Sequence, residues 1–155
     1  MDYHSVQFIY QKKKLLTVWY TDDKDGFVTK GRKILFFKNY CIENRIICEE
    51  NEVSFDIDWL IHWYVSNSEE INEKEMLDIW NIFTDLAYSI DEHFLGDEDN
   101  YNQVYSKLFY GNNLPTINKS GRIYTPDWSK EEIEEIRAVM KNGVELFERS
   151  IQIVN

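Results

Sequence analysis

Apolar residues in the first third of the chain gather in short runs of the kind that form β-strands. Five runs rich in β-branched and aromatic residues are separated by polar segments, and they cover residues 6–10, 15–20, 33–37, 46–49 and 53–57. The segments TDDKDG and KGR between these runs contain the residues that favour tight turns. The pattern predicts short N-terminal strands, with a reversal of the chain at TDDKDG, another tight turn at KGR, and one short helical turn over residues 39–44.

From residue 56 onward the apolar spacing changes to the three- and four-residue repeat of amphipathic helices. Asp56 or Asp58 can cap a first short helix that ends at the polar stretch SNSEE. Asn72 and Glu75 make a capping box for a longer helix, which we expect to end at Gly96. Its buried face comprises two rows of apolar residues: Met76, Trp80, Phe83, Ala87, Ile90 and Phe94, and Ile79, Ile82 and Leu86.

Two more helices are predicted in the last third of the chain. A short one over residues 102–110 should end at Gly111, and a loop of irregular composition, GNNLPTINKSGRIYTPDW, follows it. Ser129 and Glu132 form a second capping box that begins the last helix. Its apolar stripe runs from Ile133 through Ile136, Met140, Val144 and Phe147 to Ile151, and Gly143 on it permits close helix packing.

The order of these elements, with strands first and helices after, defines the expected fold class. It predicts an α+β fold, in which a mainly antiparallel N-terminal sheet is covered by C-terminal helices. No internal repeat, low-complexity tract or proline-rich linker divides the chain, so residues 1–155 are interpreted as a single domain.

Composition narrows the possible functions. With 43% apolar residues, including five Trp, the chain has too much large apolar surface for a disordered protein. Its 28 acidic and 17 basic residues give a net charge of −11, which repels nucleic acid and anionic membranes and attracts cationic proteins. The same charge also serves solubility, and that simpler explanation stays open. The start MDYHSVQFIYQKKK has the charge order opposite to a secretory signal, which favours a cytoplasmic location.

The sequence contains no complete motif for binding a metal or a cofactor. TDDKDGFVTKGR resembles a calcium loop, but Thr21 occupies the first ligand position and Arg32 the last, so we interpret it as a hairpin turn. Cys41 and Cys48 lack the second pair that a zinc site needs and are interpreted as buried thiols. No metal and no cofactor are expected.

Catalysis finds no signature either, and we predict that the protein is not an enzyme. There is no nucleophile motif and no phosphate-binding glycine loop. Two histidines have acids at helical spacing, His62 with Asp58 and His93 with Asp97, although two ligands do not make a metal site. A small hydrolase or transferase built around His62 or His93 remains one alternative, and a structural adaptor subunit remains another.

Clusters of acidic residues are the remaining candidates for function. Those at predicted helix starts are explained by the helix dipole, which stabilises each negative charge there by ~0.3 to 1 kcal/mol. Acids in predicted loops or edges have no such explanation, and tyrosines beside them suit the centre of an interface. The predicted partner-binding residues are Glu49, Glu50, Glu52, Asp97, Glu98, Asp99, Tyr101 and Tyr105.

Several segments resemble the small acidic immunity proteins that bacteria pair with polymorphic or contact-dependent toxins. They are GRKILFFKNYCIEN, FDIDWLIHW, IWNIFTDLAYSI, KLFYGNNLPTI and YTPDWSKEEIEEI followed by GVELF. The resemblance covers most of the chain after Gly31. It implies a stoichiometric inhibitor that binds a cognate toxin domain, often a basic nuclease, and blocks its active cleft.

Overall fold

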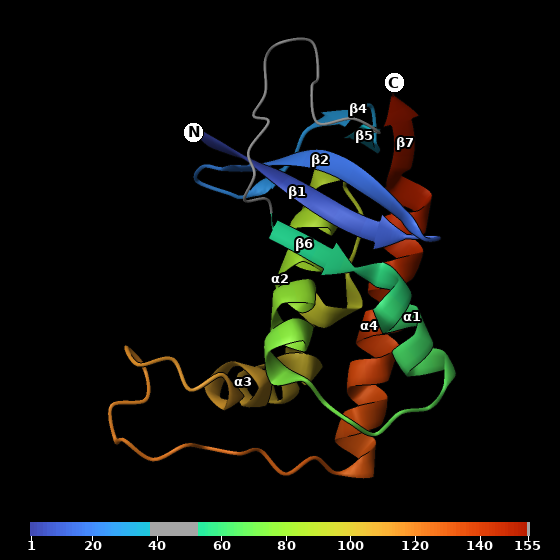
Figure 1. Ribbon diagram of the computed structural model, residues 1–155. Helices are drawn as coiled ribbons and strands as arrows, with labels where there is room; N and C mark the ends of the chain where they lie inside the picture. Colours follow the sequence, from blue (N-terminus) through green and yellow to red (C-terminus); the bar gives the residue numbers. More distant parts are fainter. Residues whose placement is uncertain (38–52, 155) are drawn as a thin grey trace.

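Two long strands form the centre of the sheet in the computed structural model, which describes residues 1–37 and 53–154 (Figure 1). β1 (Asp2–Tyr10) and β2 (Lys13–Thr21) pair antiparallel along their whole length, from the Asp2–Thr21 pair to the Tyr10–Lys13 pair. Gln11 and Lys12 connect them, both with positive φ, which gives the two-residue hairpin turn whose twist matches that of the strands. The chain therefore reverses tightly between the two strands.

Five shorter strands complete a seven-stranded sheet. They are β3 (Gly26–Phe27), β4 (Thr29–Lys30), β5 (Lys33–Phe37), β6 (Val53–Asp56) and β7 (Ile151–Val154). The order along the sheet is β4-β5-β2-β1-β6, with β3 paired to β2 and β7 paired to β5. β6 and β7 join in parallel and the other pairs are antiparallel, so the sheet is mixed but mostly antiparallel, as predicted.

Four α-helices pack against this sheet, which confirms the α+β class (Figure 1). They are α1 (Ile57–Val65), α2 (Glu73–Ser89), α3 (Asn102–Gly111) and α4 (Lys130–Ser150). Two 3-10 turns, η1 (Leu95–Asp97) and η2 (Asp99–Tyr101), connect α2 to α3. None of the helices in the described ranges is both long enough and apolar enough to cross a bilayer.

The predicted helix starts are confirmed by the side chains that cap them. Asp56 accepts a hydrogen bond from the Trp59 amide at 2.9 Å, so Asp56 rather than Asp58 caps α1. Asn72 accepts from the Glu75 amide at 3.1 Å to begin α2. At the start of α4 the Ser129 and Glu132 side chains form the reciprocal capping box. Each cap satisfies amide groups that have no partner inside the helix.

The expected end of the second helix at Gly96 is wrong. α2 stops at Ser89, and Asp91 takes the left-handed conformation, with φ 55°, that reverses the chain. Gly96 lies instead in η1, where an added Cβ would sit 2.7 Å from the Trp80 Nε1 and 2.6 Å from the Phe94 ring. The glycine is needed there for close packing against α2. In the sequence, a glycine with this role looks the same as one that ends a helix.

The C-terminal end also differs from the expected helix. Ile151 was predicted to continue the apolar stripe of the last helix, but α4 ends at Ser150 and residues 151–154 form β7, which runs parallel to β5. The Ile34–Ile151 pair begins this register. The sheet therefore includes both the first and the last element of the chain, because β7 follows every helix.

The core lies between the sheet and the helices and is rich in aromatic rings. Phe8 of β1 is fully buried, and its ring centre lies 5.8 Å from that of Phe36, 5.5 Å from Phe55 and 5.0 Å from Phe147 on α4. The two rows of apolar residues predicted for α2 are all buried, as are those predicted for α4 up to Phe147. Burial of such rings is the main source of stability in a domain of this size.

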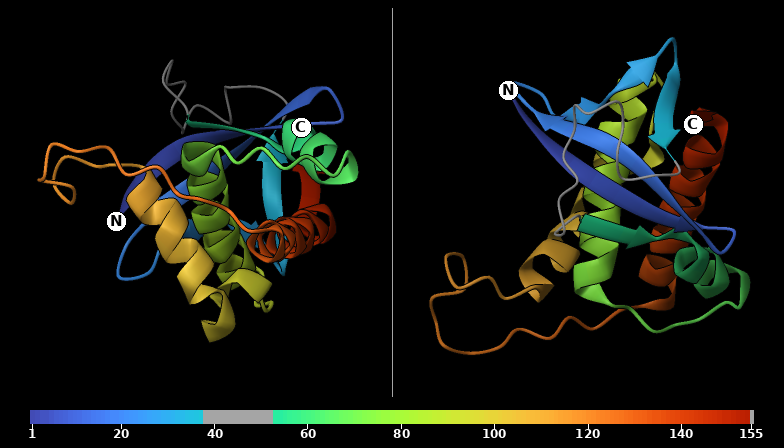
Figure 2. Two further views of the ribbon diagram at one scale, coloured as in Figure 1. Left: turned by 90° about the horizontal axis from the view of Figure 1, so that it is seen from below. Right: turned by 45° about the horizontal axis from the view of Figure 1, so that its top comes forward.

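Close packing of α2 on α4 depends on Gly143, as the sequence predicted. A Cβ placed on Gly143 would lie 2.0 Å from Cδ2 of Phe83, well inside van der Waals contact. The missing side chain therefore lets the Phe83 ring rest directly on the backbone of α4. Figure 2 shows α2 and α4 on the same face of the sheet from two further directions.

Some predictions fall on residues outside the described ranges. They are the strand over residues 46–49, the helical turn over residues 39–44, and the two thiols Cys41 and Cys48.

Candidate protein-binding surface

The three acids predicted to contact a partner lie on the two 3-10 turns between α2 and α3. Asp97 is exposed and accepts a hydrogen bond from the Thr84 hydroxyl at 2.8 Å. Glu98 pairs with the His93 Nε2 at 2.7 Å. Asp99 is exposed at the start of η2. Two of the three acids thus have an intramolecular partner, and Asp97 is directed toward α2.

The predicted tyrosine anchors lie beside these acids but are packed against the core. The Tyr105 hydroxyl donates to the Asn81 side chain at 2.7 Å, and its ring meets the Trp80 ring edge-on at 5.5 Å between centres. Tyr101 is half-buried against the same apolar core. Tyr105 joins α3 to α2, and the partial burial of both residues leaves only part of each ring available to a partner. Glu49, Glu50 and Glu52 lie outside the described residues.

Asp85 on α2 is a further acid of this surface, and the sequence analysis did not single it out. Its Oδ2 accepts a hydrogen bond from the Trp19 Nε1 at 2.8 Å, and no cation forms a salt bridge with it in the described part of the chain. Burial, together with the negative charges of Asp25 and Asp97, raises the pKa of Asp85 to about 6, against the lowering effects of the Trp19 bond and of Lys24. A half-buried carboxylate with acidic neighbours is a place where an added cation is favoured.

Tyrosines lie near this carboxylate, and two of them are exposed. Burial raises the pKa of the Tyr20 hydroxyl, with smaller contributions from Tyr88, Asp22, Asp85 and Tyr3, so these groups lie close together. Tyr3 and Tyr88 are 49% and 45% exposed, which leaves their rings accessible to a partner. The only cation among them, within the described ranges, is Lys24, whose Nζ lies 4.0 Å from the centre of the Tyr88 ring.

We call the set Tyr20, Asp22, Asp25, Asp85, Tyr88 and Asp97 the acidic tyrosine surface. It joins the turn after β2 to the exposed side of α2. The Ser89 hydroxyl holds the two together, because it accepts from the Phe27 amide at 2.7 Å and donates to the Asp85 carbonyl at 2.8 Å. Gly26 makes the approach possible, since a Cβ there would lie 2.7 Å from the Tyr20 hydroxyl.

The sequence carried only part of the signal for this surface. The segment TDDKDG was interpreted as a turn, and β2 does pair antiparallel with β3 through Trp19–Phe27 and Tyr20–Gly26, which confirms the reversal. Asp85 occupies a polar position in an amphipathic helix, and the sequence pattern does not distinguish an acid there from any other surface residue. Only the folded chain brings that position against the turn.

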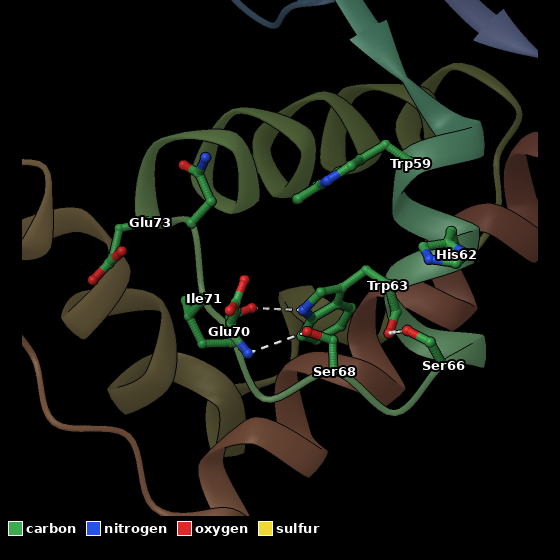
Figure 3. A pocket seen from close by; sticks show the side chains of 9 residues that line it. Trp59, His62, Trp63, Ser66, Ser68, Glu70, Ile71 and Glu73 are labelled. Atoms are coloured by element: carbon green, nitrogen blue, oxygen red, sulfur yellow. Dashed lines mark hydrogen bonds between the residues drawn. The ribbon is translucent and has the colours of Figure 1, made fainter.

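The histidine-based alternative can be compared with a pocket beside α1. A hollow of about 630 Å³ lies between α1 and the segment that leads into α2 (Figure 3). Trp59 and His62 lie on one side of it and Glu73 on the other. The two serines of its rim bond to nearby backbone, because the Ser66 hydroxyl donates to the Trp63 carbonyl at 3.3 Å and the Ser68 hydroxyl accepts from the Glu70 amide at 3.3 Å.

No pair of general base and nucleophile is formed in this pocket. Within the described ranges His62 makes no hydrogen bond to an acid or a hydroxyl, and no group of three or more metal-ligating side chains is present there. Asp58, the predicted neighbour of His62, is used elsewhere: its two oxygens accept from the amides of Gln11 and Lys12 at 2.8 and 2.9 Å. The side chain of His93 is 69% exposed and paired with Glu98. An enzymatic role remains an untested alternative.

Comparisons with known proteins give a fold relationship. No model of a protein family matches the chain, and no curated protein sequence matches it. A solved structure that is similar is the crystal structure of the C-terminal domain of SatS in complex with bromine, with a TM-score of 0.52 over 98% of this chain and 94% of that one. The two sequences are 8% identical, so the likeness concerns the fold alone.

Proposed function

We propose that this protein is an immunity protein, which binds a cognate, basic toxin domain by direct protein contact and blocks its activity. The contact is made by the acidic tyrosine surface. The segment IWNIFTDLAYSI, one of those that resemble immunity proteins, contains both Asp85 and Tyr88 of that surface. The proposal requires no chemistry from the chain, because an inhibitor of this kind acts by occupying the cleft of its target.

One observation carries the proposal: the Asp85 carboxylate is half-buried without a salt-bridge partner in the described chain, beside exposed tyrosine rings. Such an arrangement lowers the stability of the unbound protein, because a buried charge without a countercharge is poorly solvated. An arginine or lysine from a partner would supply the countercharge, and the tyrosines would supply the apolar contacts that interface centres prefer. Residues that serve function commonly lower the stability of the protein in this way.

The net charge acts at longer range. The charge of −11 attracts a basic partner before contact and can raise its association rate by ~10- to 10³-fold at low ionic strength. A fast encounter matters for an inhibitor whose target damages the cell that makes it. The acids that lie away from the acidic tyrosine surface contribute to this steering without touching the partner.

The test is co-expression of this chain with the protein encoded by the adjacent reading frame, which the proposal identifies as the toxin. We expect the chain to restore growth and to form a one-to-one complex. Asp85→Asn removes the charge but keeps an acceptor for Trp19, and it should weaken the complex by about tenfold or more, as expected for a residue at the centre of an interface.

Glu145→Gln is the matched control, because Glu145 is an exposed acid on α4, in the part of that helix near Tyr64 of α1. It should leave the complex unchanged. An adjacent gene product that is not toxic, or a toxic one that this chain neither binds nor neutralises, would overturn the proposal. Equal losses from Asp85→Asn and Glu145→Gln would move the contact away from the acidic tyrosine surface.

A further inference from the structure

A second surface, opposite in character to the first, is formed where α3 ends. Residues 112–128 leave α3, extend away from the body of the protein and return to the start of α4 (Figures 1 and 2). Five of the ten large hydrophobic residues that are exposed in the described chain lie on this segment or directly before it: Tyr110, Leu114, Ile117, Ile123 and Tyr124. Exposed apolar residues gathered in this way mark binding sites more often than chance.

Two asparagines hold this segment in one conformation. The Asn113 side chain accepts a hydrogen bond from the Tyr124 amide at 2.7 Å and donates one to the Tyr124 carbonyl at 2.9 Å. It therefore pairs with both backbone groups of that residue, as a neighbouring β-strand does. Asn118 donates to the Asn113 side chain at 2.9 Å and to the Arg122 carbonyl at 2.7 Å. The segment is therefore ordered by its own side chains, and its exposed apolar residues are presented in a defined arrangement. A preorganised surface binds at a lower entropic cost.

Four of these exposed side chains, those of Tyr110, Ile117, Ile123 and Tyr124, line an open hollow. It measures about 620 Å³ and lies between α3 and the extended segment, with Tyr110, Ile117 and Ile123 among its walls. A space of this size accepts one or two large side chains. Ile123, at 82% exposure, has no packing role in the unbound protein that would explain its apolar character.

The charge of this hollow is basic, in contrast to the net negative charge of the chain. Its walls include Lys107 and Arg122 and no acidic residue, and Lys119 is adjacent in sequence. Lys107 is paired with Glu132 at 2.9 Å, but Arg122 and Lys119 form no ion pair within the described ranges. These cations are therefore available to a carboxylate brought by a ligand.

From this we infer that the hollow binds a short peptide segment of a partner protein in which an aliphatic or aromatic side chain is flanked by carboxylates. The apolar side chain enters between Tyr110 and Ile123, and the carboxylates meet Arg122 and Lys119. This site is independent of the acidic tyrosine surface, because that surface attracts bases and this one attracts acids.

Two other occupants fit the charges less well. A second copy placed on the same surface by two-fold symmetry would bring Arg122 and Lys119 against their own equivalents, and like charges directly opposed are unfavourable. An anionic membrane would attract these cations but repel a chain of net charge −11.

The experiment uses three peptides of equal length as probes: one alternates leucine with aspartate, one leucine with lysine, and one serine with aspartate. Each is titrated into the ¹⁵N-labelled chain while its amide resonances are followed. We expect saturable shifts around Ile117, Ile123 and Tyr124 with the leucine–aspartate peptide only. Ile123→Ser should weaken this binding by about tenfold, as for an anchor residue, and Arg122→Glu should transfer the preference to the leucine–lysine peptide.

The control is Val65→Ser, which removes a comparably exposed apolar residue from α1 and should change nothing. Thermal unfolding of each variant verifies that it is folded, and Asp85→Asn should bind the peptide as the parent does, which separates this site from the proposed toxin contact. Absence of binding, equal binding of the lysine peptide, or shifts elsewhere would overturn the inference. So would an Ile123-dependent dimer in sedimentation, or Ile123-dependent binding to phosphatidylcholine–phosphatidylserine vesicles, because either would assign the surface to another occupant.

Discussion

The indole Nε1 of Trp19 donates a hydrogen bond of 2.8 Å to the Oδ2 of Asp85, and this bond connects β2 to α2 at the edge of the acidic tyrosine surface. The bond stabilises the ionised carboxylate, yet burial outweighs it and raises the pKa of Asp85 from its ordinary value of 3.8 to about 6. Asp85 therefore has two effects: its bond to Trp19 positions α2 on the sheet, and its charge remains poorly solvated at the surface.

The first prediction concerns stability and its dependence on pH. A carboxyl group whose pKa is raised on folding contributes stability below its unfolded pKa, and that stability is lost as the pH rises through the folded pKa. Asp85→Asn should therefore stabilise the protein at pH 7 by about 1 to 2 kcal/mol, allowing for partial solvent screening of the charge. The gain should disappear near pH 4. Urea unfolding at pH 4, 5.5 and 7 measures it, and a loss of stability at pH 7 would contradict the stated burial cost.

A second prediction concerns the acids on the 3-10 turns. Charge reversal at Asp97, Glu98 and Asp99 should slow association with the cognate toxin, and the effect should be larger at low salt than at high salt because salt screens charges beyond roughly 10 Å. Stopped-flow association kinetics at two ionic strengths measure this. A matched triple reversal on α4, which produces the same change in net charge, uses Glu131, Glu135 and Glu145. Equal slowing by both triple variants would mean that net charge, and not this location, steers the partner.

A third prediction concerns the contact between α2 and α4. Alanine at position 143 would improve helix propensity by about 1 kcal/mol, but its Cβ would lie 2.0 Å from the Phe83 ring. We expect Gly143→Ala to lower the free energy of unfolding by about 2 to 3 kcal/mol, since overpacking a rigid core displaces the ring or the helix. Lys141→Ala, at an exposed position of the same helix, is the control and should have little effect. A stabilised Gly143→Ala protein would show that the two helices separate easily.

A fourth prediction concerns the hairpin that begins the sheet. The Asp58 carboxylate accepts hydrogen bonds from the backbone amides of Gln11 and Lys12. Neither turn residue is the glycine or asparagine that such turns favour. Asp58→Ala should therefore cost about 1 to 3 kcal/mol, because two charge-assisted hydrogen bonds are lost and the left-handed turn loses its support. Amide hydrogen exchange should rise first at Gln11 and Lys12. Unchanged exchange there would mean that the strands alone determine the turn.

Local pattern was sufficient for most of the elements. Asn72, Ser129 and Glu132 identify helix starts because a cap and its amide partner lie within four residues of one another, and the α2 and α4 stripes follow from a period of 3.6 residues. The acids at residues 97–99 were also identifiable, since they fall between two helical patterns. The caps and the stripes depend on neighbours in sequence, and for that reason they were predicted correctly, whereas the contact role of the acids at residues 97–99 stays a prediction.

The errors have a common cause. Gly96 was interpreted as a helix stop, but its lack of a side chain accommodates Trp80 and Phe94, and Ile151 was assigned to a helix although β5 recruits it into the sheet. In both cases a residue's role is determined by a partner distant along the chain. A sequence window contains no information about that partner.

The sequence by itself determined the α+β class, the net negative charge, and the identity of the caps and buried stripes, because each of these is a property of composition or of short-range spacing. Tertiary structure alone decided which acids act together: it placed Asp85 beside Asp25 and Asp97, committed Asp58 to a hairpin turn, and turned Tyr105 toward Asn81. The physical reason is that the energy of a charge depends on its burial and on the charges around it, and both arise only when distant segments pack.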